Sequence, residues 1–599
     1  MVDARWVGFV GHSPVSAVRT VSGGGSVIMS GVASDVLQMV LLLAAVLLAA
    51  WPLGRYMARV FQGERTFLDP VLRPLERGLY RLFGLNASRE MSWKTYAWAV
   101  IAFNAVGMAV LFVLQLVQGW LPFNPQHFSA VRWDTALNTA ASFITNTNWQ
   151  SYSGESTMSY FTQMAGLTVQ NFLSGATGVA VLIALIRGLV RRRASAIGNF
   201  WVDMTRCTLW VLLPLSLVVS LVLVSQGVIQ NLHPYVTVQT VEGVNQTLAM
   251  GPVASQEAIK MLGTNGGGFF GANSAHPFEN PTPLSDLVEI WSIIVIPAAL
   301  VFTFGRMIGK PRQGAAILGA MLFLLVVALA GNYISERMGN PLLAQMGVQA
   351  PTAMEGKEVR FGLGQSSLFS VVTTAVACGA VNNMHDSLTP LGGMVPMLLM
   401  MLGEVVFGGE GSGLYGMLVF AILAVFLVGL MVGRTPEFLG KKIESREVKL
   451  ATLAGVIIPS ATILIGAAIS VVTPAGLASL GNPGPHGLSE VLYGFASGVG
   501  NNGSAFAGLN ANTPYYNLMI AAAMLIGRFG VIVPVLGIAG SLAEKNKVPE
   551  GPGTFRTDTP LFSVLLSVTI VLVVALTFFP SLALGPIVEH IMMWQGMAA

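Results

Sequence analysis

Residues 263–283 read GTNGGGFFGANSAHPFENPTP, a polar, glycine-rich segment that lies between long apolar stretches of the chain. In a membrane-embedded protein, irregular backbone of this kind survives only where it is buried in protein or lines a water-filled cavity. The segment therefore predicts the wall of a pore. This requirement limits the possible fold more than any other feature of the sequence.

Three other segments have the same polar, Asn- and Gly-containing character and recur at a steady interval. They are residues 145–150 (TNTNWQ), 378–383 (CGAVNN) and 500–504 (GNNGS). The markers Asn146, Gly266, Gly379 and Gly503 are 120, 113 and 124 residues apart. A regular period indicates one structural unit used four times. The period is long enough for a transmembrane helix, a re-entrant segment and a second transmembrane helix.

The composition is that of a membrane protein. The 599 residues are 53% hydrophobic and 10% charged, with a mean hydropathy of +0.68, whereas soluble domains contain roughly 25% charged residues. Stretches of about 20 apolar residues, enough to cross a bilayer, predict ten spans and put both termini on one side. The predicted spans cover residues 36–53, 96–120, 164–186, 208–227, 287–304, 315–334, 414–432, 453–472, 518–540 and 561–582.

The distribution of Lys and Arg predicts the orientation. Of the 32 basic residues, 25 lie in segments 54–95, 187–207, 305–314, 433–452 and 527–560. Because cytoplasmic loops carry the excess of Lys and Arg, both termini are predicted to lie outside the cytoplasm. This asymmetry accounts for the net charge of +4, which therefore does not call for a nucleic-acid partner.

The predicted fold class is an all-α polytopic membrane protein with four pseudo-repeated helix–pore loop–helix units around a central selectivity filter. Residues 1–35 form an external tail, of which residues 1–28 could also lie upstream of a true start at Met29. The other predicted divisions are residues 36–95 (first span and basic cytoplasmic segment), 96–207, 208–314, 315–452 and 453–560 (four pore repeats), and 561–599 (last span).

Each polar segment follows a short amphipathic stretch, at residues 133–144, 255–262, 366–377 and 488–497. A half-membrane helix followed by a polar strand is how an ion filter is built. The C-terminal ends of such helices carry partial negative charge, which favours a cation.

Two further features could control how an ion leaves the filter. Residues 391–407 form an apolar segment interrupted by Gly and Pro that carries Glu404, and it either folds under the filter or is an ordinary kinked helix. Arg528 lies deep in the apolar sequence AAAMLIGRFGVIVPVLG. It either faces the pore as a gate or extends to the cytoplasmic surface.

The polar segments offer the ligands that a dehydrated monovalent cation needs, which are backbone carbonyls with Asn, Thr and Ser oxygens. Carboxylates, which Ca²⁺ and Mg²⁺ prefer, do not occur within these short strands. Cys207 and Cys378 are expected to be reduced, unpaired and not metal ligands. The candidate filter residues are Asn146, Thr147, Asn148, Gln150, Thr264, Asn265, Gly266, Gly267, Gly268, Asn273, Cys378, Gly379, Ala380, Asn501, Asn502, Gly503 and Ser504.

Catalytic motifs are weak in comparison. The sequence contains no GxxxxGK[ST] loop and no DKTGT phosphorylation motif, so no ATP site or ATPase activity is expected on this chain. A membrane enzyme using His276, His385, Asp386 and Glu404 is a poor alternative because these residues show no metal-ligand spacing.

Several long motifs resemble those of the KdpA family, the potassium-translocating subunits of bacterial Kdp potassium-transporting ATPases. They include TNTNWQSYSGE, ACGAVNNMHDSLTPLGGMVPM, GEVVFGGEGSGLYGM and NNGSAFAGLNANTP. The fourth strand reads Gly500-Asn501-Asn502 where the family more often has three Asn residues. The likeness covers nearly everything after Met29.

The resemblance implies a potassium-transporter fold in the bacterial inner membrane and K⁺ as the transported ion. It implies a P-type ATPase partner, KdpB, which hydrolyses ATP, and the further partners KdpC and KdpF. It also implies ion binding at the filter and, for Glu404 and Arg528, exit blocking and gating. The alternative is a passive potassium channel or secondary transporter of the same superfamily.

Overall fold

The computed structural model describes residues 24–348, 352–403, 405–433, 435–549 and 555–597. Glu404 and the first 23 residues of the predicted tail lie outside these ranges. The roles predicted for them therefore stay predictions.

Within the described residues, ten helices are long and apolar enough to cross a membrane, which confirms the predicted number of spans. Several contain a short π-helical turn. The spans are built from α1 (Gly24–Gln62), α3 (Trp93–Leu116), η2 (Thr162–Thr168) with α6 (Val169–Val190), α7 (Phe200–Arg206) with η3 (Cys207–Leu212) and α8 (Leu213–Ser225), α10 (Pro283–Met307), α11 (Pro311–Met338), α15 (Ser412–Val432), α16 (Ser445–Thr452) with η6 (Leu453–Ile457) and α17 (Ile458–Ser470), α20 (Pro514–Glu544), and α21 (Pro560–Leu582) with η7 (Ala583–Ile587) and α22 (Val588–Trp594).

The second span of each repeat lies nearer the centre of the molecule than the first span. In the second spans, which contain α6, α10, α15 and α20, 50–83% of the residues in the apolar 18-residue stretch of the span are buried. In the first spans this share is 22–44%. The start of α10 shows how such a helix is fixed. The Thr282 side chain accepts from the Ser285 N–H, the Ser285 hydroxyl accepts from the Thr282 N–H, and Pro283 begins the helix, as is typical of a capping box.

Four shorter helices, one per repeat, are almost wholly buried among the spans. They are α4 (Trp133–Ile144), α9 (Val253–Leu262), α13 (Gly362–Ala375) and α19 (Gly484–Val499). The bounds of α4 match the prediction, and the other three helices begin two to four residues earlier than predicted. The predicted interruption in the third repeat is also present, because α14 (Pro390–Met401) ends well before α15 begins at Ser412.

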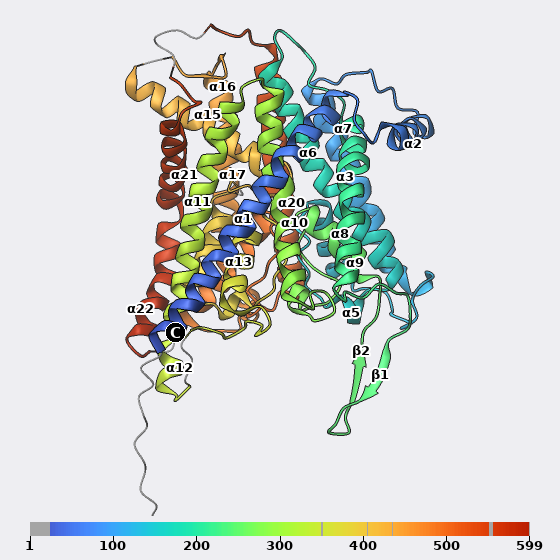
Figure 1. The fold of residues 1–599 in the computed structure, drawn as a ribbon, viewed down its shortest axis with the longest axis vertical. Coiled ribbons are helices and arrows are strands. Elements are labelled where there is room, and N and C mark those ends of the chain that lie inside the picture. Colours follow the sequence, from blue (N-terminus) through green and yellow to red (C-terminus); the bar gives the residue numbers. More distant parts are fainter. Residues whose placement is uncertain (1–23, 349–351, 404, 434, 550–554, 598–599) are drawn as a thin grey trace, which may run out of the picture.

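The remaining elements lie mainly at the two ends of the bundle (Figure 1). One end carries α2 (Asp69–Leu82) and α16, and the other carries the β-hairpin, α12 (Pro341–Gln345), α22 and the C-terminal end. Strand β1 (Val236–Gln239) pairs antiparallel with β2 (Asn245–Leu248), and β3 (Glu437–Phe438) with β4 (Lys441–Lys442). The smallest elements are η1 (Gln118–Trp120), α5 (Gly154–Thr157), η4 (Asn273–Ala275), η5 (His385–Ser387) and α18 (Pro474–Leu477).

Candidate ion-binding site

Each short helix ends in an irregular polar segment whose backbone turns in the same way. The second residue after each helix has a positive φ, which is uncommon outside glycine. These residues are Asn146 (68°), Thr264 (45°), Ala377 (51°) and Asn501 (52°). By this alignment Asn148, and not Asn146, is the counterpart of Gly266, Gly379 and Gly503. The marker chosen from sequence in the first repeat is therefore wrong by two residues.

The four segments converge at Gly266. A β-carbon built on this glycine would lie 2.7 Å from the carbonyl oxygen of Thr147, 3.0 Å from that of Cys378 and 2.9 Å from that of Asn502. These three oxygens come from the other three repeats. We call the carbonyl oxygens of Thr147, Cys378 and Asn502, together with the backbone of Gly266, the oxygen ring.

Two more glycines allow the backbones of neighbouring polar segments to lie this close together. Gly379 and Gly503 have φ values of +86° and +102°, a region that glycine enters at little cost. A β-carbon on Gly379 would overlap the carbonyl oxygen of Asn502, and one on Gly503 would overlap that of Thr147. Neighbouring repeats therefore touch backbone to backbone.

Amide side chains tie neighbouring segments together. Asn146 donates from Nδ2 to the carbonyl oxygens of Gly263 (3.2 Å) and Thr264 (3.0 Å), and its Oδ1 accepts from Asn265 at 2.5 Å. Asn501 donates from Nδ2 to Thr147 Oγ1 at 3.0 Å. These contacts use Asn146 and Asn501 to join the strands. Their predicted role as ligands of the ion stays a prediction.

Gln150 holds the outer part of the second segment with both ends of its amide. Its Nε2 donates to the Gly268 carbonyl at 2.9 Å, and its Oε1 accepts from the Gly268 N–H at 2.9 Å. Asn148, in contrast, is fully buried, and neither amide atom has a hydrogen-bond partner among the described residues. An unpartnered buried amide is costly, which keeps Asn148 among the candidate ligands, and its role as an ion ligand stays a prediction.

Not all candidate residues face the ring. Asn273 lies behind the second segment, where its Oδ1 accepts from Lys260 Nζ at 3.0 Å. Ser504 bonds to Tyr493 and to Asn502 Oδ1. Cys378 contributes through its carbonyl oxygen, while its thiol donates to the Asn265 carbonyl.

Buried charge also supports the second segment, and none of the predicted site residues includes it. Lys260 in α9 forms an ion pair with Glu257 at 2.7 Å, and both side chains are 1% exposed. Glu279 accepts from the backbone N–H groups of Phe269 and Phe270. The signal available in the sequence was the i, i+3 spacing of Glu257 and Lys260 within a short buried helix.

Arg528 lies against α6. It is 3% exposed and donates from Nη2 to the Ser174 carbonyl at 3.0 Å, so it does not extend to the surface. A β-carbon on Gly178 would lie 3.3 Å from this nitrogen and would overlap the Glu410 carbonyl. Arg528 and the loop before α15 therefore meet on one face of α6.

Glu410 is a second buried residue near the ring that is not among the predicted site residues. It is 1% exposed, and neither carboxylate oxygen has a hydrogen-bond partner among the described residues. A β-carbon on Gly175 would lie 2.7 Å from Glu410 Oε2 and 3.2 Å from the Gly263 carbonyl. A carboxylate without a hydrogen-bond partner among the described residues thus lies beside the second segment, in the loop between α14 and α15.

Residues 40–591 match the family model described as KdpA, potassium-transporting ATPase A subunit. The chain belongs to the KdpA family. Two curated relatives carry the name potassium-transporting ATPase potassium-binding subunit. The one from Koribacter versatilis is 57% identical over 584 residues and the one from Methylibium petroleiphilum is 59% identical over 567 residues. The alignments cover 94% and 93% of this chain and 99% and 98% of the relatives.

This KdpA family member is also similar to one solved structure, that of the potassium transporter TrkH from Vibrio parahaemolyticus. The comparison gives a TM-score of 0.49 and 13% identity, and it covers 84% of this chain and 96% of the TrkH chain.

Proposed function

We propose that this chain binds K⁺ from outside the cell in the oxygen ring and passes it to a P-type ATPase subunit, which hydrolyses ATP to drive import. The names of the relatives and the family match support this function. The ion is the cargo of the complex, and hydrolysis takes place on the partner chain. The proposed partners are KdpB, KdpC and KdpF.

The observation that carries the proposal is the meeting of four backbone segments at Gly266. Carbonyl oxygens of three repeats lie within 3.0 Å of one β-carbon position on the fourth. Rings of carbonyl oxygens replace the hydration shell of K⁺ in selective pores. No carboxylate is part of the ring, so a monovalent ion can bind there and still leave.

The path below the ring is proposed to be controlled by Arg528 and Glu410. Arg528 presents a positive charge against α6 at Gly178, which opposes direct exit of a cation. Glu410, one helical turn away at Gly175, offers a negative charge next to the second segment. A cation leaving the ring is then attracted toward the interruption between α14 and α15, instead of passing straight to the cytoplasm.

The proposed orientation puts both termini outside and the chain in the bacterial inner membrane. The basic segment that contains α2 and the segment that contains α16 lie at one end of the bundle, opposite the C-terminal end (Figure 1). The positive-inside rule assigns the basic end to the cytoplasm.

Reconstitution tests the proposal against a passive channel. Vesicles that contain this chain with its ATPase partners are expected to take up K⁺ when ATP is supplied. Vesicles that contain this chain alone are expected to show neither ATP hydrolysis nor fast K⁺ flux. Rapid, ATP-independent flux through this chain alone would favour the channel.

A further inference from the structure

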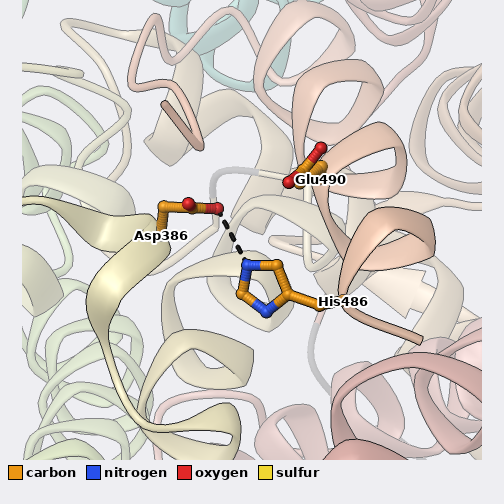
Figure 2. A group of neighbouring side chains, drawn as sticks. All are labelled: Asp386, His486 and Glu490. Carbon is orange, nitrogen blue, oxygen red and sulfur yellow. Dashed lines mark hydrogen bonds and ion pairs between the residues drawn. The ribbon is translucent and has the colours of Figure 1, made fainter. Parts of the chain in front are cut away.

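A cluster of three ionisable residues lies away from the oxygen ring, at the start of α19. His486 and Glu490 are one turn apart on α19, and Asp386 comes from η5 in the third repeat. One ligand atom from each of these residues lies within 4.8 Å of the other two. In Figure 2 the Asp386 carboxylate points toward the His486 ring, and Glu490 lies on the same side of that ring.

A fourth residue orients the imidazole. Glu589, in α22, lies 2.7 Å from His486 Nδ1, while His486 Nε2 lies 3.1 Å from Asp386 Oδ1. When Nδ1–H donates to Glu589, the Nε2 lone pair faces Asp386 and Glu490. A histidine that binds a metal almost always donates its other N–H to a carboxylate or carbonyl in this way.

The two remaining carboxylates are also held in place. Glu490 accepts from Asn482 Nδ2 at 2.7 Å and from the Gly481 N–H at 3.1 Å. A β-carbon on Gly508 would overlap Glu490 Oε1 and would lie 2.9 Å from Asp386 Oδ2. Both carboxylates thus border the same glycine, where a larger side chain would fill the space between them.

We propose that Asp386, His486 and Glu490 bind a divalent transition-metal ion of the Zn²⁺ class. Zinc binds His nitrogen at about 2.0–2.1 Å and carboxylate oxygen at about 2.0–2.2 Å. Two such ligands at angles between about 90° and 109° lie roughly 3.0–3.4 Å apart. The 3.1 Å between Nε2 and Oδ1 fits, whereas the three ligand atoms together lie within 4.8 Å of one another, so the Glu490 carboxylate has to move toward the other two ligands to complete the site. A cavity of about 160 Å³ borders the cluster on the side of Asp386, His486 and Glu589, away from Glu490, and a water ligand would enter from that side.

The competing state is an imidazolium that bridges two carboxylates without a metal. Burial lowers the pKa of His486, but the hydrogen bonds to Asp386 and Glu589 raise it to about 10 overall. A metal therefore has to displace the Nε2 proton. Three carboxylates surround the single imidazole, so a divalent ion would leave less net negative charge in the cluster than a proton does.

The site would join the C-terminal helix to the fourth repeat. Glu589 lies on α22, and the Phe506 ring lies between His486 (6.2 Å) and Tyr493 (4.0 Å). Tyr493 in turn bonds to Ser504 in the fourth polar segment at 2.8 Å. A bound metal would therefore stiffen the support behind this segment without touching the transported ion.

The test measures Zn²⁺ binding to the purified full complex, which is first treated with a chelator and dialysed. Calorimetry gives the affinity for Zn²⁺, and metal analysis gives the number of ions bound. Wild type is expected to bind one Zn²⁺ at this site, with one His nitrogen in its X-ray absorption spectrum. His486→Gln should abolish that binding, and Glu490→Gln, a smaller change in shape, should weaken it at least tenfold. Glu589→Gln should weaken it by about 10- to 100-fold, because it only orients the histidine.

His233→Gln, at an exposed position away from the cluster, is the matched control and should bind as wild type does. The proposal is overturned if wild type binds no Zn²⁺. It is equally overturned if His486→Gln and Glu490→Gln, both shown to be folded by thermal unfolding, bind as well as His233→Gln. In either case the imidazolium bridge is the correct description of the cluster.

Discussion

Gly266 has no room for a side chain because it faces carbonyl oxygens from three other repeats. Gly266→Ala should therefore push these oxygens apart and weaken K⁺ binding. We expect the K⁺ concentration for half-maximal ATPase activity to rise about tenfold or more, since a loss of about 1.4 kcal/mol has that effect. Gly78→Ala, in α2 with no neighbouring atom within 4 Å of the added carbon, is the control. Equal K⁺ affinity in the two variants would contradict the placement of the ring.

Gln150 should affect affinity through the backbone that it holds. Gln150→Leu removes both hydrogen bonds to Gly268, each worth about 0.5–1.5 kcal/mol, and should raise the half-maximal K⁺ concentration several-fold. Gln150→Arg should raise it further because it adds positive charge beside the site. Gln239→Leu, on the exposed hairpin, should leave it unchanged. Wild-type affinity in Gln150→Leu would show that this amide does not support the site.

For single residues, the sequence predicted which polar segments meet but not which groups each side chain contacts there. Gly379 and Gly503 could be found because only glycine allows such close backbone approach. The hydrogen-bond partners of Asn146 and Asn273 could not be predicted, because an amide can bind an ion, join two backbone segments or accept a hydrogen bond from a lysine. The choice depends on neighbours more than ten residues away, such as Asn265 and Lys260.

Among the short helices, the stability of α9 depends on its buried ion pair between Lys260 and Glu257. Lys260→Met leaves the Glu257 charge uncompensated, which for buried pairs costs about 3–5 kcal/mol. We expect a large fall in the thermal unfolding temperature of the purified complex, and partial recovery in the double variant Lys260→Met/Glu257→Gln. Lys442→Met, which breaks an exposed pair with Glu444, should cost about 0–1 kcal/mol. Similar losses from Lys260→Met and Lys442→Met would argue against a supporting role for the buried pair.

Helix positions could be predicted, whereas some helix starts could not. The apolar periodicity located all four short helices, because each must bury its faces among the spans. The start of α19 at Gly484 was missed because Gly-Pro-His-Gly is typical of a loop. Pro485, however, lies in the first turn, where proline is favoured. The role of α22 was also missed, since the cluster joining Glu589 to His486 exists only in three dimensions.

For the whole molecule, Arg528 should decide whether ion movement and ATP hydrolysis stay linked. Arg528→Ala removes the positive charge beside α6, so K⁺ in the site should escape without being passed on. We expect ATP hydrolysis to continue while K⁺ uptake per ATP falls, measured in vesicles containing the complete complex. Arg528→Lys keeps the charge and should retain more of the coupling. Tightly coupled transport in Arg528→Ala would place the gate elsewhere.

Rubidium binding tests the oxygen ring most directly, because Rb⁺ replaces K⁺ and scatters strongly. In a structure of the complete complex with Rb⁺, a density peak is expected between the carbonyl oxygens of Thr147, Cys378 and Asn502, next to Gly266. The peak should weaken in Gly266→Ala and persist in Gly78→Ala. A complex that transports Rb⁺ but shows its ion peaks away from these four segments would contradict the proposed site.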